Sequence, residues 1–226
     1  DLRSVRQVTH HGEISTFNWS PDGNELAFSS GECWIIDTLG NVLRNVLPVD
    51  SSHGSWAVAG FPMWSRRGDR MLLTRGDSLT KMSVIVIDTM GNFLDEILRA
   101  ESHWASIAYP RWSPDESRFT LNVSYVDEQR FTHSDLRIYD MEGRLERILT
   151  EDAGAAQWSP GGSEIAFQKY TWMAPSRNPM IEPDYGRVTV WTCNPDGSDM
   201  TELLGWPQPE YDTTMFDGGY NWLSER

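Results

Sequence analysis

A repeat centred on tryptophan constrains the fold of this chain more than any other feature of its sequence. In each copy a serine follows the tryptophan, and a short polar turn and an apolar segment come next. The copies are FNWSPDGNELAFSS around Trp19, PMWSRRGDRMLLTR around Trp64, PRWSPDESRFTLNV around Trp112 and AQWSPGGSEIAFQK around Trp158, with a fifth start, YNWLSER, at Trp222. Successive tryptophans are 45, 48, 46 and 64 residues apart, at or just above the spacing of propeller blades.

A second marker lies inside each of the four complete copies. A run rich in β-branched residues closes on Asp-x-x-Gly or a variant of it, and a short apolar segment follows; the glycines are Gly40, Gly91, Gly143 and Gly197. Each copy therefore reads as four short strands, with the tryptophan ending the first strand and Pro and Gly in the turn after it. The second strands are rich in apolar residues, which suits a sheet covered on both faces.

Units of this size cannot bury a core alone, so they must stack, and radial stacking produces a β-propeller. We therefore predict an all-β chain: a β-propeller of four-stranded antiparallel blades, forming a single domain over residues 1–226. The complete blades are expected at residues 14–47, 58–98, 107–150 and 154–204.

End strands are expected at residues 4–9 and 218–223, the first aligning with a fourth strand and the second with a first strand. Because these two positions are not neighbours in a blade, we expect the chain to be part of a larger propeller. A four-blade ring with two stray end strands is the competing interpretation.

One segment carries a conflicting signal. In residues 92–104 the apolar side chains of Phe93, Leu94, Ile97 and Leu98 have helical spacing. The segment nevertheless aligns with the fourth strands of the other units, and we predict a strand.

The WSPDG turn, the apolar strand after it and the later Asp-x-x-Gly resemble the WD-like repeats of TolB-type β-propellers. Similar repeats build the propeller domains of prolyl-oligopeptidase-type proteases and of oligogalacturonate-lyase-like enzymes. The resemblance covers nearly the whole chain and implies a propeller in an extracytoplasmic compartment, periplasmic or secreted. It does not select a function, because propellers host many.

Two turns depart from the pattern. The second copy has Arg66 and Arg67 where Pro and Asp are expected, and the third copy has Glu116 where Gly is expected. We expect these two turns to be looser, with the strand registers preserved.

Charge restricts the partners. The chain has 19 Lys and Arg against 33 Asp and Glu, a formal net charge of −14, which disfavours nucleic acid and anionic membrane surfaces. The sequence contains no apolar run of membrane-spanning length, and we expect no membrane insertion. It also lacks a Gly-rich phosphate loop and a Gly-x-Ser-x-Gly elbow, and we assign no catalytic residue.

The longer insertions all precede a first strand or separate a second from a third strand. In a propeller these connections share one end of the blades, and variable loops on a rigid scaffold are where binding residues usually lie. The insertions are residues 48–60, 99–109, 205–219, 124–134 and 170–187.

The histidines fall in or beside these insertions. His11, His53 and His103 occupy equivalent positions in successive units, and His133 lies in another insertion. Three imidazoles with a carboxylate such as Glu13 or Asp152 would suit a divalent transition metal. Oligogalacturonate-lyase-like enzymes are similar in using channel-mouth histidines around a metal. The alternative is that these histidines bond to neighbouring loop backbone.

Aromatic side chains share the same insertions. Such clusters stack against sugar rings or anchor protein partners, although inter-blade packing explains them equally well. The candidate ligand-binding residues are Trp56, Trp104, Trp172, Trp206, Tyr211 and Tyr125.

These features favour a non-catalytic recognition module that binds a protein or glycan partner through its long loops. The alternative is a metal-dependent carbohydrate-active enzyme of the polysaccharide-lyase type. Such an enzyme needs positive charge to neutralise a uronate, and the long loops contain few cations. A third interpretation is the propeller of a peptidase whose catalytic domain lies outside this chain.

Overall fold

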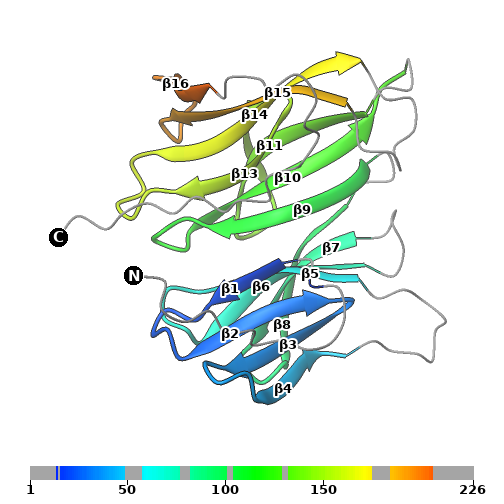
Figure 1. The fold of residues 1–226 in the computed structure, drawn as a ribbon, viewed down its shortest axis with the longest axis vertical. Helices are drawn as coiled ribbons and strands as arrows, with labels where there is room; N and C mark the ends of the chain where they lie inside the picture. The colour runs from blue at the N-terminus through cyan, green and yellow to red at the C-terminus, as the bar shows by residue number, and fades with distance from the viewer. Residues whose placement is uncertain are drawn as a thin grey trace, which may run out of the picture. The chain divides into compact units, whose positions relative to one another are not determined.

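Four antiparallel four-stranded sheets make up the computed structural model, which describes residues 14, 16–48, 58–76, 82–100, 104–128, 132–174 and 184–205 (Figure 1). In every sheet the strands are hydrogen-bonded in chain order, which is the topology of a β-propeller blade. The all-β propeller fold predicted from the repeat is therefore confirmed. The proposed end strands at 4–9 and 218–223 lie outside the described residues.

The chain divides into two compact units, residues 1–99 and 100–226, which we describe separately. Unit 1 contains blade 1, with strands β1 (Thr16–Trp19), β2 (Glu25–Ser30), β3 (Glu32–Asp37) and β4 (Val42–Leu47), and blade 2, with β5 (Val58–Trp64), β6 (Arg70–Gly76), β7 (Met82–Asp88) and β8 (Phe93–Arg99). Unit 2 contains blade 3, with β9 (Trp104–Trp112), β10 (Arg118–Val126), β11 (Thr132–Asp140) and β12 (Leu145–Thr150), and blade 4, with β13 (Ala153–Trp158), β14 (Ile165–Ala174), β15 (Asp184–Cys193) and β16 (Thr201–Gly205).

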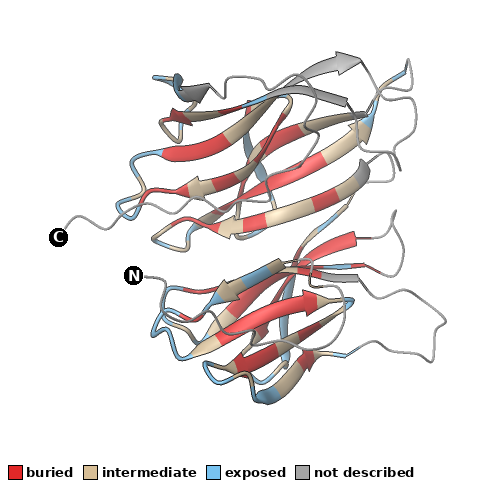
Figure 2. Ribbon diagram, in the orientation of Figure 1, coloured by how far each residue is buried: buried red, intermediate tan, exposed pale blue. Residues whose placement is uncertain are grey.

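Burial within a blade follows strand position (Figure 2). The central strands are buried over most of their length, and in blade 2 every residue of β7 before Asp88 is buried. The outer strands are exposed except near their ends, as in β8, where Ile97 is the one buried residue. The ambiguous segment is therefore a strand, because Phe93, Glu96 and Leu98 pair with β7. No helix long and apolar enough to cross a membrane occurs in the described residues.

The larger core cluster of each unit is shared between its two adjacent blades. In unit 1, Trp64 of blade 2 packs in one cluster with Ile35 and Val46 of blade 1. In unit 2, Trp158 of blade 4 packs in one cluster with Leu136 and Leu149 of blade 3. Trp64 and Trp158 thus each cover a face of the preceding blade in their own unit.

The turn after the tryptophan has one geometry in all four blades. The serine at its start is buried, and its backbone N–H donates to the carbonyl five residues later. The serine carbonyl accepts the N–H of the residue three positions later, and all these distances are 2.8–3.0 Å. In blade 2, Asp69 accepts a hydrogen bond from the Ser65 hydroxyl at 2.8 Å, as Asp22 does from Ser20 at 2.6 Å. The expectation of a looser turn was therefore wrong in both blades, because the serine and a nearby carboxylate are sufficient to hold it.

Blade 3 forms the turn at the expense of backbone strain. Glu116 has φ of 58°, where the other three blades have glycines with φ between 72° and 76°. A side chain in this left-handed region costs about 1 kcal/mol.

Replacing Glu116 with glycine should therefore raise the free energy of unfolding by roughly 0.5–1 kcal/mol, since relief of strain exceeds the entropy gained by the unfolded chain. Urea titration followed by tryptophan fluorescence measures the change. The matched control is Gly162→Ala at the same position in blade 4, which should destabilise by about 1 kcal/mol. Unchanged or lowered stability in Glu116→Gly would contradict the strain assignment.

Candidate functional site

The structure describes part of the predicted site. Tyr125 is described with its side chain, and the backbones of Trp104 and Trp172 are placed on β9 and β14. The remaining predicted residues lie outside the described ranges: Trp56, Trp206, Tyr211, His11, His53 and His103. The three-histidine metal site therefore stays a prediction.

Strands extend further than expected at the end of the blades where the long loops begin, which we call the long-loop end. β10 continues to Val126 and β11 begins at Thr132, so that Tyr125 and His133 lie on paired strands and not in a loop over residues 124–134. The reason is that antiparallel pairing continues beyond the sequence signal for a strand.

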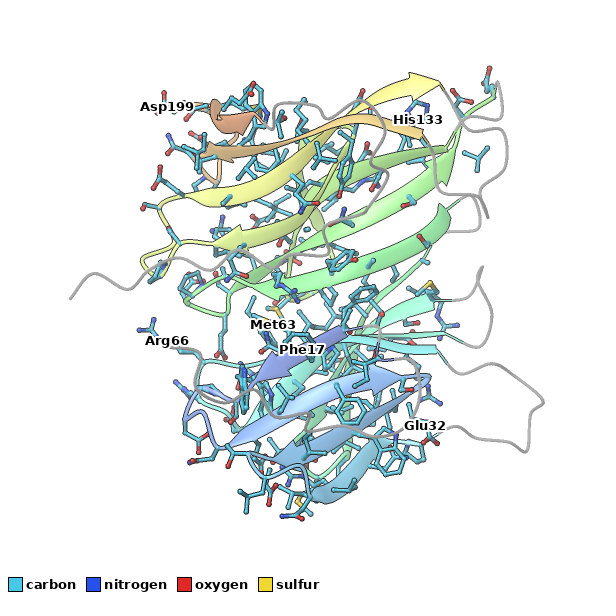
Figure 3. All side chains as sticks on the ribbon, viewed as in Figure 1. Phe17, Glu32, Met63, Arg66, His133 and Asp199 are labelled. Carbon is cyan, nitrogen blue, oxygen red and sulfur yellow. The ribbon has the colours of Figure 1, made fainter. Side chains whose placement is uncertain are left out.

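Register brings predicted residues together at this end. Tyr125 lies opposite Trp104 on one side and opposite His133 on the other, so that three adjacent strands contribute to one row. In blade 4, Trp172 lies opposite Tyr185. Figure 3 places His133 at the opposite end of the unit 2 strands from Asp199, which follows a short turn.

His133 lies between two carboxylates. Its Nε2 is 3.1 Å from Oδ2 of Asp127, and its Nδ1 is 3.6 Å from Oδ1 of Asp152. Asp127 belongs to the same hairpin, whereas Asp152 connects blade 3 to blade 4. Burial disfavours the charged ring, but the hydrogen bond to Asp127 and the charges of Asp152 and Asp127 outweigh it and raise the pKa of His133.

A buried ion pair supports the neighbouring tyrosine. Asp135 is buried, and its Oδ2 accepts a hydrogen bond from Nη2 of Arg137 at 2.8 Å. The Tyr125 hydroxyl donates to Oδ1 of Asp135 at 3.4 Å, and the Tyr125 ring stacks on His133 with centroids 5.4 Å apart. Burial, followed by the Asp135 charge, raises the pKa of Tyr125, so that the phenol stays protonated at neutral pH.

Asn122 fixes the start of β13, and with it the position of Asp152. The buried Asn122 amide donates to the Ala153 carbonyl at 2.9 Å and accepts the Ala155 N–H at 3.2 Å. Gly154 lies so close that a Cβ there would be 2.3 Å from Asn122 Nδ2. Asp152 has φ of 49°, and its carbonyl accepts the Tyr170 N–H at 2.7 Å. The second unit therefore holds this carboxylate rigidly beside His133.

The arrangement is suited to recognition by hydrogen bonds and aromatic contact. Both nitrogens of His133 face carboxylates, and the described residues contain no group of three or more His, Cys, Asp or Glu side chains arranged for a metal ion. Asp127 and Asp152 lie on either side of the His133 ring, which stacks on Tyr125.

Sequence reasoning singled out Tyr125 and Asp152 but missed the residues that organise them. Asp135 and Arg137 follow His133 at two-residue intervals, which places all three on one face of β11. That alternation was a usable signal. The contact of His133 with Asp152 had no such signal, because it joins two blades.

The raised pKa of His133 gives a pH prediction. Its folded pKa should exceed 6.5, so the stabilisation from its ion pairs is complete below pH 6.5 and is lost as pH rises through the folded pKa. Asp127→Asn should lower the pKa of His133, because it removes the shorter ion pair. Proton NMR titration of the His133 ring measures its pKa in the unaltered protein and in Asp127→Asn, and His133→Gln assigns the signal.

Asp152→Asn is the matched control, since asparagine tolerates the left-handed backbone at this position. It should lower the pKa of His133 by less than Asp127→Asn does. A His133 pKa that neither substitution changes would contradict the bridged arrangement.

The sequence matches no known family model and no curated protein sequence. Solved structures are nevertheless similar in fold. A TolB-like protein from Agrobacterium tumefaciens superposes with a TM-score of 0.59 at 22% identity, covering 89% of this chain and 65% of that one. The oligogalacturonate lyase of Vibrio parahaemolyticus gives 0.58 at 13% identity, covering 89% and 56%.

The β-propeller domain of the Trilobed protease from Pyrococcus furiosus gives a TM-score of 0.51 at 16% identity, covering 84% of this chain and 57% of that one. The chain spans less than two thirds of the length of each of these three proteins. At such identities the likeness concerns architecture. Blade topology and superposition together show that the chain has the β-propeller fold of TolB-like proteins.

Proposed function

We propose that this chain is a non-catalytic recognition module that binds a protein or glycan through the long-loop end of its blades. The observation that carries the proposal is the row of Trp104, Tyr125 and His133 across three strands of blade 3. The same end of blade 4 has Trp172 opposite Tyr185. Two adjacent blades thus place paired aromatic residues at the end where the long connections lie.

The aromatic ring of Tyr125 and the carboxylates near it indicate which class of ligand this end binds. Aromatic rings stack on the apolar faces of sugars or on apolar side chains of a protein. The Asp127 and Asp152 side chains are 23% and 27% exposed, so part of each carboxylate is accessible to a sugar hydroxyl or a basic side chain. The net charge of −14 favours a neutral or basic ligand over an anionic polymer.

An extracytoplasmic location, periplasmic or secreted, is part of the same proposal. Its support is the fold likeness to a TolB-like protein together with the resemblance of the repeats.

Substitution of the aromatic row tests the binding surface. Tyr125→Ala and Trp104→Ala should each weaken binding of a glycan or protein identified by array or pull-down at least tenfold, because stacking area is lost. Isothermal titration calorimetry measures the change. Leu145→Ala, an exposed apolar position on β12, is the control and should leave affinity unchanged. Equal affinity in all variants would place the binding surface elsewhere.

The predicted histidine set offers a separate test, because the lyase alternative requires a metal and our proposal does not. We expect no stoichiometric metal by elemental analysis and no cleavage of polygalacturonate. We also expect full ligand binding in the double variant His53→Ala, His103→Ala. Our proposal would be wrong, and the lyase alternative right, if the unaltered protein bound stoichiometric metal and cleaved polygalacturonate and the double variant lost the metal.

A further inference from the structure

A second surface lies at the opposite end of the blades, where short turns join the third strands to the outer strands. In unit 1 these turns and the starts of β4 and β8 carry large apolar side chains that are 45–69% exposed. We call them the turn-edge patch: Leu39, Val42, Leu43, Met90, Phe93 and Leu94. Figure 2 shows β4 beginning in an exposed stretch.

The two halves of the patch come from different blades but adjoin. The Arg44 Nε on β4 donates to the Thr89 carbonyl in the blade 2 turn at 2.6 Å. Gly91 in that turn approaches β4 so closely that a Cβ would lie 2.6 Å from the Val46 carbonyl oxygen. The blade 2 turn therefore packs against β4, beside the residues that blade 1 contributes to the patch.

The fold does not require apolar residues at the tips of these turns. The position of Leu39 and Met90 is occupied by Glu142 in blade 3 and by Asp196 in blade 4. All four turns form the same backbone hydrogen bond, from the glycine N–H to the carbonyl three residues earlier, at 2.8–3.1 Å. The exposed apolar tips of blades 1 and 2 consequently call for an explanation other than folding.

Charge around the patch identifies the kind of partner. Within the described residues Asp37, Asp88 and Asp95 form no ion pair, whereas Arg44 is paired with Glu25 and Arg99 with Glu96. Hydrogen bonds from the Asn41 and Asn92 side chains and backbone hold the pKa values of Asp37 and Asp88 below their usual range. The patch is thus apolar with an acidic border.

An acidic border opposes two of the candidate occupants. A second copy of this chain would bring carboxylates against carboxylates, and an anionic lipid surface would be repelled in the same way. It complements a segment that presents apolar side chains between basic ones.

We propose that the turn-edge patch binds a protein segment whose apolar side chains are flanked by lysine or arginine. Apolar contact with the turn tips provides affinity, and the border carboxylates select basic flanks. This surface is separate from the long-loop end, so either proposal can fail without the other.

The test measures binding of a synthetic peptide of alternating leucine and lysine blocks to the full chain by fluorescence anisotropy. The double variant Leu39→Glu, Met90→Glu should weaken binding at least tenfold. Both turns should still form, because blade 3 has Glu142 at that position. Purely electrostatic attraction of a basic peptide would instead grow stronger with two added carboxylates. Loss of binding therefore reports the apolar contact.

Two further variants separate the contributions. Asp95→Asn should weaken binding of the leucine–lysine peptide several-fold, whereas Leu145→Glu on β12 should leave it unchanged. Amide NMR shifts should be confined to residues 38–43 and 89–94.

Several results would overturn the proposal. These are undiminished binding in the double variant, equal binding of a leucine–glutamate peptide, self-association through the patch in analytical ultracentrifugation, or preferential binding to anionic phosphatidylglycerol vesicles.

Discussion

Contact between neighbouring blades is the interaction on which the rest of this structure depends. A four-stranded sheet has two faces, and a single blade has no second layer of its own to bury the apolar residues on them. Trp64 and Trp158 close one face of the preceding blade, and both are about 5% exposed. The Trp64 indole also donates to the Asn18 carbonyl of blade 1 at 3.2 Å. Trp19, which has no preceding blade in the described part of unit 1, is 49% exposed. Trp64 and Trp158 are therefore buried by packing between the two blades of one unit.

The two ends of each blade are built on different principles. At the short-turn end, a buried serine and a backbone hydrogen bond impose one turn geometry, and departures as large as Arg66 and Arg67 or Glu116 leave it intact. The turns between third and fourth strands share a different hydrogen bond, from the glycine N–H to the carbonyl three residues earlier, and their tips also vary, as between Met90 and Glu142. At the long-loop end, β10 and β11 extend far enough to place Tyr125 opposite His133, and His133 meets Asp152 of the next connection. The proposed recognition surface lies at the long-loop end, whereas the turn-edge patch lies at the short-turn end, where the tip residues vary.

Much of the fold was predictable because its determinants are local. The spacing of tryptophans, the turn residues and the apolar second strands indicate the blade directly, and the fourth strand at Phe93–Arg99 followed from alignment despite its helical spacing. The candidate site was less predictable. Tyr125 was chosen for its position beside a long loop, yet it lies on a strand, and Asp135 and Arg137 beneath it were missed. Strand ends are weakly specified by sequence, because pairing with a neighbour extends them.

The sequence by itself determined that this chain folds as four-stranded blades, since strand periodicity and turn chemistry act over a few residues. It also determined an acidic chain with aromatic residues gathered in the long connections. Only the tertiary structure decided which residues meet. His133 faces Asp152 because Asn122 fixes the start of the next blade, and Arg44 meets Thr89 because the blade 2 turn packs on β4. Each contact joins residues of two different blades, and packing between the blades places them together.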